Sequence, residues 1–329
     1  MSNIPTAQTF VYQTVGKLEV KLDLYVPPNA TGSLPAIICF HGGGLTVGDR
    51  YPGPMTATWL LEMATANGII FISPDYHLLC PSTGFDQIGD VTALFHFLST
   101  KVNAHLSGVT LDASRIGITG VSAGAYLARL AALYAEPRPR AILSLYGMGG
   151  DWFSDFYLAL KTTTIPLFGS MVSKEVGAEL VKFEKMDPVV EAPLRTCGDR
   201  SKLFPWWWQN GIMLDILVGE VGLSDRLRAL PPAEREAAVP SHLATVFPQL
   251  HINSSFPPTM FIHGQDDTAV IVGESEYTHQ QLQKAGVRSE LYVVPGAEHG
   301  LVILPSWKQV PEAPGMYKKG FEFLAKEIA

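Results

Sequence analysis

The chain has 329 residues, a length that allows two domains or one large α/β core with an insertion. Its 24 Lys and Arg residues against 31 Asp and Glu residues give a net charge of −7, which excludes the basic surface that nucleic acid or an anionic membrane attracts. Hydrophobic residues make up 47% of the chain and charged residues 17%, which excludes a mainly disordered protein and indicates a large core or an apolar cleft.

The residues 9–26 alternate apolar and polar side chains, which predicts an antiparallel pair of strands ending at Pro27. Short apolar runs ended by turn residues then predict buried parallel strands at 35–40, 69–73, 115–119, 141–146, 259–263 and 290–294. Helical patterns lie between these runs, at 55–66, 85–106, 123–135, 274–285 and 316–329. This alternation predicts the α/β fold class, with a mostly parallel central sheet and helices on both faces.

One interval, 147–257, breaks the alternation. It shows no clear strand and is rich in aromatic residues, so we expect a helical cap inserted into a core formed by 1–146 and 258–329. We expect an apolar substrate pocket lined by Leu45 and by the cap residues Trp206, Trp207 and Trp208. Ordinary packing inside the cap is the alternative explanation for the three tryptophans.

Three cysteines, Cys39, Cys80 and Cys197, are widely spaced and form no C-x-x-C pair. This spacing argues against a disulfide framework and a zinc site, and it favours a reducing compartment such as the cytoplasm. The first residues lack a basic segment followed by an apolar one, and no apolar run reaches about eighteen residues. We therefore expect neither a signal peptide nor a membrane span.

The segment 120–124 reads G-V-S-A-G and lies between a predicted strand and a predicted helix, the setting of a nucleophile elbow. Its two glycines let neighbouring backbone pass closely, so that the hydroxyl of Ser122 stands above the sheet. The pattern predicts Ser122 as a nucleophile. A capping serine in a glycine-rich turn is the alternative.

The segment 41–44 reads H-G-G-G and directly follows a predicted parallel strand. Loops of this composition supply backbone N–H groups to the oxyanion of a tetrahedral intermediate. We expect such donors from Gly43, Gly44 and Ala123, while His41 and Gly42 shape the loop. A flexible or phosphate-binding loop is the alternative, but no G-K-[ST] follows.

A catalytic base is expected after the last predicted strand, where His299 stands in P-G-A-E-H-G. The acid that orients it should follow the preceding strand, where H-G-Q-D-D offers both Asp266 and Asp267. Ser122, an aspartate and His299 then occur in the chain order of hydrolases that have a nucleophile elbow. His263 precedes the acid, so we expect it to be a structural residue at the end of its strand.

In their order, these motifs resemble the α/β-hydrolase superfamily and, within it, the hormone-sensitive-lipase-like (α/β-hydrolase fold-3) esterases. The motifs H-G-G-G, Gly48-Asp49, Asp75-Tyr76, G-V-S-A-G, H-G-x-x-D and E-H-G cover the chain from about residue 35 to its end. The resemblance implies an α/β-hydrolase fold and selects Asp267, the last residue of H-G-x-x-D, as the acid. The chain departs from this group at 75–81, which reads D-Y-H-L-L-C-P where relatives have D-Y-R-L-A-P-E, and in its short segment before H-G-G-G.

These residues predict acyl transfer through an acyl-enzyme on Ser122, with His299 as general base and acid and Asp267 orienting its ring. With water as the acceptor, the protein is a carboxylic ester hydrolase for apolar acyl substrates of small to medium size. If water is excluded, a substrate hydroxyl takes the acyl group, as in a lactone-forming cyclase or an acyltransferase. A non-catalytic binding module on a hydrolase scaffold is the third alternative.

The expected partner is a small-molecule ester or lactone. We expect no cofactor, no metal and no nucleic acid, because the chain lacks H-E-x-x-H and any cluster with metal-ligand spacing. The sequence leaves the oligomeric state open, a homodimer included.

Overall fold

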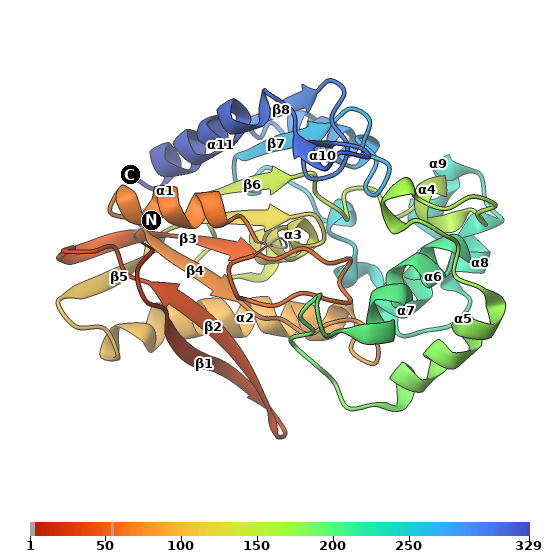
Figure 1. Cartoon of the computed structure of the whole chain (residues 1–329), viewed down its shortest axis with the longest axis horizontal. Coiled ribbons are helices and arrows are strands. Elements are labelled where there is room, and N and C mark those ends of the chain that lie inside the picture. The colour runs from red at the N-terminus through yellow and green to blue at the C-terminus, as the bar shows by residue number, and fades with distance from the viewer. Residues whose placement is uncertain (1–3, 54–55) are drawn as a thin grey trace.

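The computed structural model describes residues 4–53 and 56–329, and its centre is an eight-stranded sheet (Figure 1). The strand order is β1-β2-β4-β3-β5-β6-β7-β8. β1 (Gln8–Val15), β2 (Leu18–Tyr25) and β4 (Ile70–Pro74) pair in antiparallel fashion. Every other neighbouring pair is parallel, and these pairs also involve β3 (Gly32–Phe40), β5 (Val109–Val121), β6 (Ala141–Leu145), β7 (Thr259–Gly264) and β8 (Ser289–Val294). The prediction of a mostly parallel sheet is confirmed.

Two layers of helices cover the sheet. α1 (Thr58–Ala66) and α11 (Ala313–Glu327) pack on one face, and α2 (Gly84–Thr100), α3 (Gly124–Tyr134) and α10 (Gly273–Lys284) pack on the other. Successive strand residues point to opposite faces, so Ile37 joins the core under α1 and α11, whereas Ile38 joins the core under α2 and α3. Coverage on both faces explains why the central strands read as continuous apolar runs.

Some element boundaries differ from the predicted ones. The helix predicted at 85–106 ends at Thr100, and a 3₁₀ turn, η1 (Val102–Ala104), follows it. The helix predicted at 55–66 begins at Thr58, and residue 55 lies outside the described residues. A short hairpin of β9 (Val302–Ile303) and β10 (Lys308–Gln309) was not predicted, because two-residue strands carry no periodic pattern.

Between β6 and β7, all residues are described and none forms a strand, as predicted. We call residues 146–258 the insertion. Its α-helices are α4 (Asp155–Leu158), α5 (Lys174–Leu180), α6 (Leu203–Gln209), α7 (Met213–Val218), α8 (Leu223–Arg228) and α9 (Pro232–Arg235). Its 3₁₀ turns are η2 (Pro166–Phe168), η3 (Val181–Lys185), η4 (Gly198–Lys202), η5 (Glu236–Ala238), η6 (Ala244–Val246) and η7 (Pro248–Leu250). Figure 1 shows α4 to α9 gathered beyond the carboxyl ends of the parallel strands.

The insertion is bonded to the core through a buried arginine. Arg200 is 6% exposed, and its guanidinium donates to the carbonyls of Thr46 at 2.8 Å, Leu79 at 2.6 Å and Cys80 at 3.0 Å. Thr46 belongs to the loop after β3, whereas the two other carbonyls belong to the loop after β4. One side chain of the insertion therefore holds two core loops together.

Candidate active site

Ser122 lies in a tight turn between β5 and α3. Its φ of 52° is in the left-handed region, which is unusual for a residue with a side chain. A Cβ at Gly120 would lie 2.3 Å from the Cα of Ala125, and a Cβ at Gly124 would lie 2.1 Å from the carbonyl oxygen of Phe40. Only glycine fits at these two positions, because any side chain would overlap backbone atoms. The turn therefore presents the Ser122 side chain at the carboxyl edge of the sheet.

Three predicted side chains meet at this edge. The Oγ of Ser122 lies 2.9 Å from Nε2 of His299, and Nδ1 of His299 lies 2.8 Å from Oδ2 of Asp267. An ionised carboxylate only accepts hydrogen bonds, so Nδ1 carries the ring proton and Nε2 is left to accept the hydroxyl proton of Ser122. The side chain of His299 is 14% exposed and that of Asp267 is fully buried. The serine hydroxyl is thus paired with a proton acceptor that a buried carboxylate orients.

The carboxylate of Asp267 has several donors around it. Its Oδ1 accepts the backbone N–H groups of Ala269 at 3.0 Å and Val270 at 2.8 Å. Burial raises the pKa of Asp267, but His299 and His263 outweigh this effect and hold that pKa below its usual range. Asp266, the other candidate acid, is exposed to solvent. The structure therefore brings Asp267, and not Asp266, to His299.

Glu298 joins the loops that carry the acid and the base. This buried side chain accepts hydrogen bonds from the backbone N–H and the hydroxyl of Thr268 and from the backbone N–H of His299. The ring of Tyr146 packs edge-on against His299, with the ring centres 4.9 Å apart. Sequence analysis assigned a role to neither residue. For Glu298 the only available signal was its position beside His299 in E-H-G.

The glycines after β3 form a tight loop, residues 41–48, which we call the glycine loop. The carbonyl of Gly43 accepts the N–H groups of Thr46 and Val47, each at 3.1 Å, and both Gly43 and Gly44 have positive φ. A Cβ at Gly43 would lie 2.1 Å from the carbonyl oxygen of Val47. Within the described residues, no hydrogen bond outside the helices and strands uses the N–H of Gly43, Gly44 or Ala123. These predicted oxyanion donors are left without a protein acceptor.

His41 shapes the base of the glycine loop, as expected. It is fully buried, its Nδ1 lies 2.8 Å from the carbonyl oxygen of Gly42, and its ring stacks on Tyr76 with centres 4.3 Å apart. A Cβ at Gly48 would lie 2.4 Å from Nδ1 of His41. The glycine of the Gly48-Asp49 motif therefore leaves room for this imidazole.

The residues expected to line a pocket have different surroundings. Leu45 is fully buried in the glycine loop. A Cβ at Gly177 of α5 would lie 2.4 Å from the ring of Trp206, and the ring of Trp208 packs against Phe156, so these contacts lie within the insertion. The three tryptophans all belong to α6, in which Trp207 is buried. A substrate-binding role for Leu45, Trp206, Trp207 and Trp208 stays a prediction.

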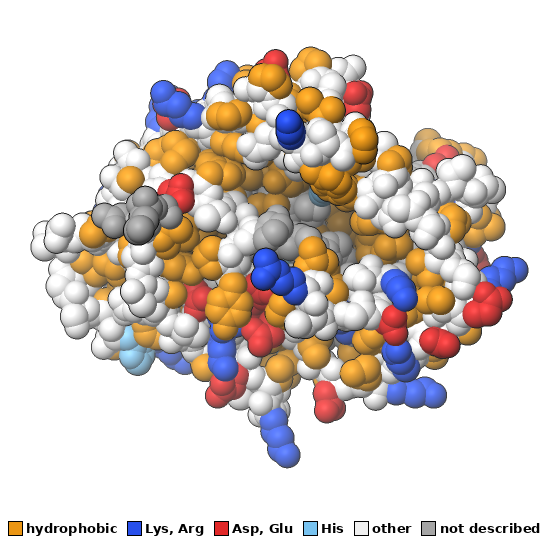
Figure 2. Space-filling model, viewed as in Figure 1, with side chains coloured by type: hydrophobic (Ala, Val, Ile, Leu, Met, Phe, Trp, Pro, Cys, Tyr) orange, Lys and Arg blue, Asp and Glu red, His pale blue; other side chains and the backbone are white. Residues whose placement is uncertain are grey.

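Phe204 of α6 was not predicted, yet it contacts the glycine loop. A Cβ at Gly44 would lie 3.0 Å from Cγ of Phe204, so the phenyl ring covers this glycine. Phe168 packs edge-on against Phe204, with ring centres 5.8 Å apart. Figure 2 shows the surface hollowed between the core and the insertion, with hydrophobic side chains on the rim. An aromatic part of the insertion therefore lies against Gly44 of the glycine loop.

The described residues contain neither a metal-binding cluster nor a helix that could span a membrane. In residues 4–53 and 56–329, no cluster of three or more His, Cys, Asp or Glu side chains is placed to hold a metal ion. No helix of this part of the chain is both long and apolar enough to cross a membrane.

The chain is similar to several known proteins and protein families. The BD-FAE family model matches residues 22–141, and the prolyl oligopeptidase family model matches residues 234–312. The chain is 29% identical over 247 residues to the probable carboxylesterase M8 of Phoma sp., a match that covers 72% of this chain and 69% of that protein. It is 25% identical over 366 residues to the non-reducing polyketide synthase pkbA of Emericella nidulans, a match that covers 98% of this chain and 14% of the synthase.

Among solved structures, an α/β-hydrolase superfamily protein from Enterococcus faecalis aligns with a TM-score of 0.61 at 17% identity, covering 98% of this chain and 99% of that one. Sheet order, elbow turn and this alignment define an α/β-hydrolase fold. The matches to the two family models and to the probable carboxylesterase are consistent with the resemblance of the chain to hormone-sensitive-lipase-like esterases.

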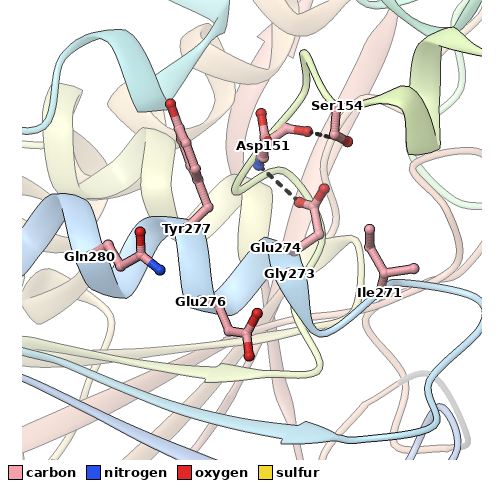
Figure 3. Close-up of a pocket in the computed structure, with 8 residues that line it drawn as sticks. All are labelled: Asp151, Ser154, Ile271, Gly273, Glu274, Glu276, Tyr277 and Gln280. Carbon is pink, nitrogen blue, oxygen red and sulfur yellow. Dashed lines mark hydrogen bonds between the residues drawn. The ribbon is translucent and has the colours of Figure 1, made fainter. Parts of the chain in front are cut away.

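A separate cavity of about 190 Å³ lies between α10 and the start of the insertion (Figure 3). No residue that lines it belongs to the group around Ser122; they are Asp151, Ser154, Ile271, Gly273, Glu274, Glu276, Tyr277 and Gln280. Glu274 is 1% exposed and accepts the backbone N–H groups of Gly150 at 2.5 Å and Asp151 at 3.2 Å. Burial raises the pKa of Glu274 from 4.5 to about 7, although the nearby Arg129 and these N–H groups oppose the shift.

This raised pKa predicts a pH-dependent loss of stability. Between pH 4.5 and 7 the folded state holds the Glu274 proton more tightly than the unfolded state does, so the stability that this group contributes is lost as the pH rises. The free energy of unfolding in urea should therefore be higher for Glu274→Gln than for wild type, and this advantage should be larger at pH 8 than at pH 5, by up to about 3 kcal/mol. The exposed Glu276→Gln serves as the control and should keep a constant difference. A constant difference for Glu274→Gln would contradict the prediction.

Proposed function

We propose that the protein is a carboxylic ester hydrolase that acts through an acyl-enzyme on Ser122. The observation that carries this proposal is the chain of hydrogen bonds from Ser122 through His299 to Asp267. His299 Nε2 takes the hydroxyl proton as Oγ attacks the ester carbonyl carbon, and it then gives this proton to the leaving alkoxide. Water, activated by the same nitrogen, cleaves the acyl-enzyme and releases the acid. Asp267 holds the ring and stabilises the imidazolium in both steps.

The oxyanion hole in this proposal consists of the N–H groups of Gly43, Gly44 and Ala123. Among the residues that the structure describes, none accepts a hydrogen bond from these groups. This supports the assignment, because a preorganised donor must be free when the carbonyl oxygen becomes negative. One such donor contributes on the order of 3 kcal/mol to the transition state.

We assign residues 147–257 as the cap over this site, with a small-molecule ester that has an apolar acyl group as the substrate. The contact of Phe204 with Gly44 supports an apolar pocket, since it sets an aromatic ring beside the proposed oxyanion hole. The similarity to a probable carboxylesterase supports the same class of substrate. A reducing, cytoplasmic location is proposed from the cysteine pattern, and the free thiols of Cys39, Cys80 and Cys197 support it.

A second candidate is transfer of the acyl group to a hydroxyl, as in a lactone-forming cyclase or an acyltransferase. The observation that favours it is the match to a polyketide synthase over 98% of this chain. The same three residues would form the acyl-enzyme, and an apolar cap that keeps water out would leave a substrate hydroxyl as the acceptor.

The experiment that separates these candidates is product analysis with p-nitrophenyl esters of increasing chain length. A hydrolase should release p-nitrophenol steadily, together with one equivalent of free acid, and the preferred chain length should measure the pocket. A burst equal to the enzyme concentration that then stalls, and resumes when an alcohol is added, would favour the second candidate. Failure of Ser122 to react with either the esters or a fluorophosphonate would contradict both.

A further inference from the structure

Asp267 is in contact with a second histidine. His263, the first residue of the H-G-x-x-D motif, lies at the end of β7 with its side chain fully buried. Its Nε2 is 3.3 Å from Oδ2 of Asp267, the same oxygen that lies 2.8 Å from Nδ1 of His299. Two imidazole rings therefore approach one carboxylate oxygen, one from the end of β7 and the other from the loop after β8.

The partners of His263 fix where its proton lies. Nε2 is 2.7 Å from the carbonyl oxygen of Val270, and a carbonyl only accepts, so Nε2 carries a hydrogen. Nδ1 is 2.8 Å from Oγ of Ser275, which is also fully buried and whose hydroxyl can donate to this nitrogen. In this tautomer the Nε2–H dipole has its positive end beside Asp267.

We propose that His263 is a positioning residue for the reaction of Ser122: its Nε2–H fixes the acid loop and shares the charge on Oδ2 of Asp267 with His299. A chain of contacts then runs over five side chains, from Ser275 through His263, Asp267 and His299 to Ser122. Its links are hydrogen bonds except for the 3.3 Å polar contact of His263 Nε2 with Asp267 Oδ2, which lies beside the hydrogen bond of Nε2 to Val270. This inference rests on the proposed function, because it assigns His263 a part in the same acyl transfer.

The consequence for the reaction follows from the shared oxygen. His299 becomes an imidazolium in the transition state, and Oδ2 of Asp267 stabilises that charge. A second donor beside Oδ2 withdraws part of the negative charge and keeps the basicity of His299 from rising. The other titratable groups around His299 are the ring of Tyr146, Glu298 on its own loop, and Tyr317 of α11, whose hydroxyl donates to the carbonyl of Gly300. None of these contacts involves His263.

The test compares His263→Phe, which removes the donor, with His263→Gln, whose amide N–H replaces it near the position of Nε2. The pH dependence of kcat/KM is measured for each, and a fluorophosphonate titration counts the active sites so that misfolded protein is excluded. For His263→Phe we expect kcat per site to fall by roughly tenfold with KM little changed. The acid limb of the profile should move to higher pH by about half a unit or more. His263→Gln should restore most of both values.

His77→Phe is the matched control. His77 is also a buried histidine paired with an aspartate, with Nδ1 2.8 Å from Oδ1 of Asp90, but this pair does not touch Ser122, Asp267 or His299. Its replacement should lower the stability while kcat per site and the acid limb stay as in wild type.

An acid limb and a kcat per site that remain at wild-type values in His263→Phe would overturn the inference. The inference would also be overturned if His77→Phe moved the acid limb of the pH profile by the same amount as His263→Phe. Failure of the proposed function would look different, since wild type itself would then neither react with the fluorophosphonate nor turn over esters.

Discussion

Replacing Ser122 by alanine is expected to lower kcat/KM for p-nitrophenyl esters by about 10⁴-fold or more. The substitution removes the hydroxyl oxygen that lies 2.9 Å from Nε2 of His299. Without this oxygen, no acyl-enzyme can form. Steady-state release of p-nitrophenol at neutral pH measures the effect, and the variant should also fail to react with a fluorophosphonate.

The control is Ser99→Ala, an exposed serine of α2, which should keep wild-type kinetics. Alanine at position 122 keeps a Cβ in the left-handed turn, so the urea unfolding curve should stay close to that of wild type. Activity within tenfold of wild type would show that Ser122 is not the nucleophile.

Asp267→Asn is expected to lower kcat by about 10⁴-fold without loss of the folded state. An asparagine amide can donate to Nδ1 of His299, which favours the tautomer whose proton is on Nε2. That tautomer has no lone pair for the hydroxyl proton of Ser122. Steady-state kinetics at neutral pH measure the loss.

Asp266→Asn is the neighbouring control. Asp266 is exposed, so its substitution should change kcat/KM by less than about twofold. If the two variants lose activity equally, the effect belongs to the loop and not to a carboxylate that orients His299.

The sequence contains a strong signal for the sheet and for the three residues that meet at its edge. Strands buried on both faces must be apolar throughout, so β4, β6 and β7 appeared as short apolar runs. Ser122, Asp267 and His299 each follow a parallel strand, and the carboxyl ends of such strands share one edge of the sheet. The choice between Asp266 and Asp267 depends on which side chain turns inward, so the residues alone left it open.

Contacts between segments that are far apart in the chain leave no local pattern in the sequence. Arg200 is 154 positions from Thr46, and an arginine in a loop-rich region looks like any solvated surface charge. Phe204 lies close to the three tryptophans in the sequence, and no local pattern distinguishes its contact with the glycine loop. The helical character of the insertion was predicted, but its individual helices were not. Its α-helices have four to seven residues, which is too few turns for a period of 3.6 to be recognised.

The backbone carbonyls bound by Arg200 limit how this protein can be re-engineered. A chimera that carries a relative's insertion on this core would leave the carbonyls of Thr46, Leu79 and Cys80 buried without a donor, unless the new segment supplies a guanidinium at the same place. Each unpaired carbonyl costs about 1–3 kcal/mol, and one of them belongs to the glycine loop. Exchanging the insertion would thus disturb the glycine loop, so Arg200 and its surroundings should be transferred or retained as one unit.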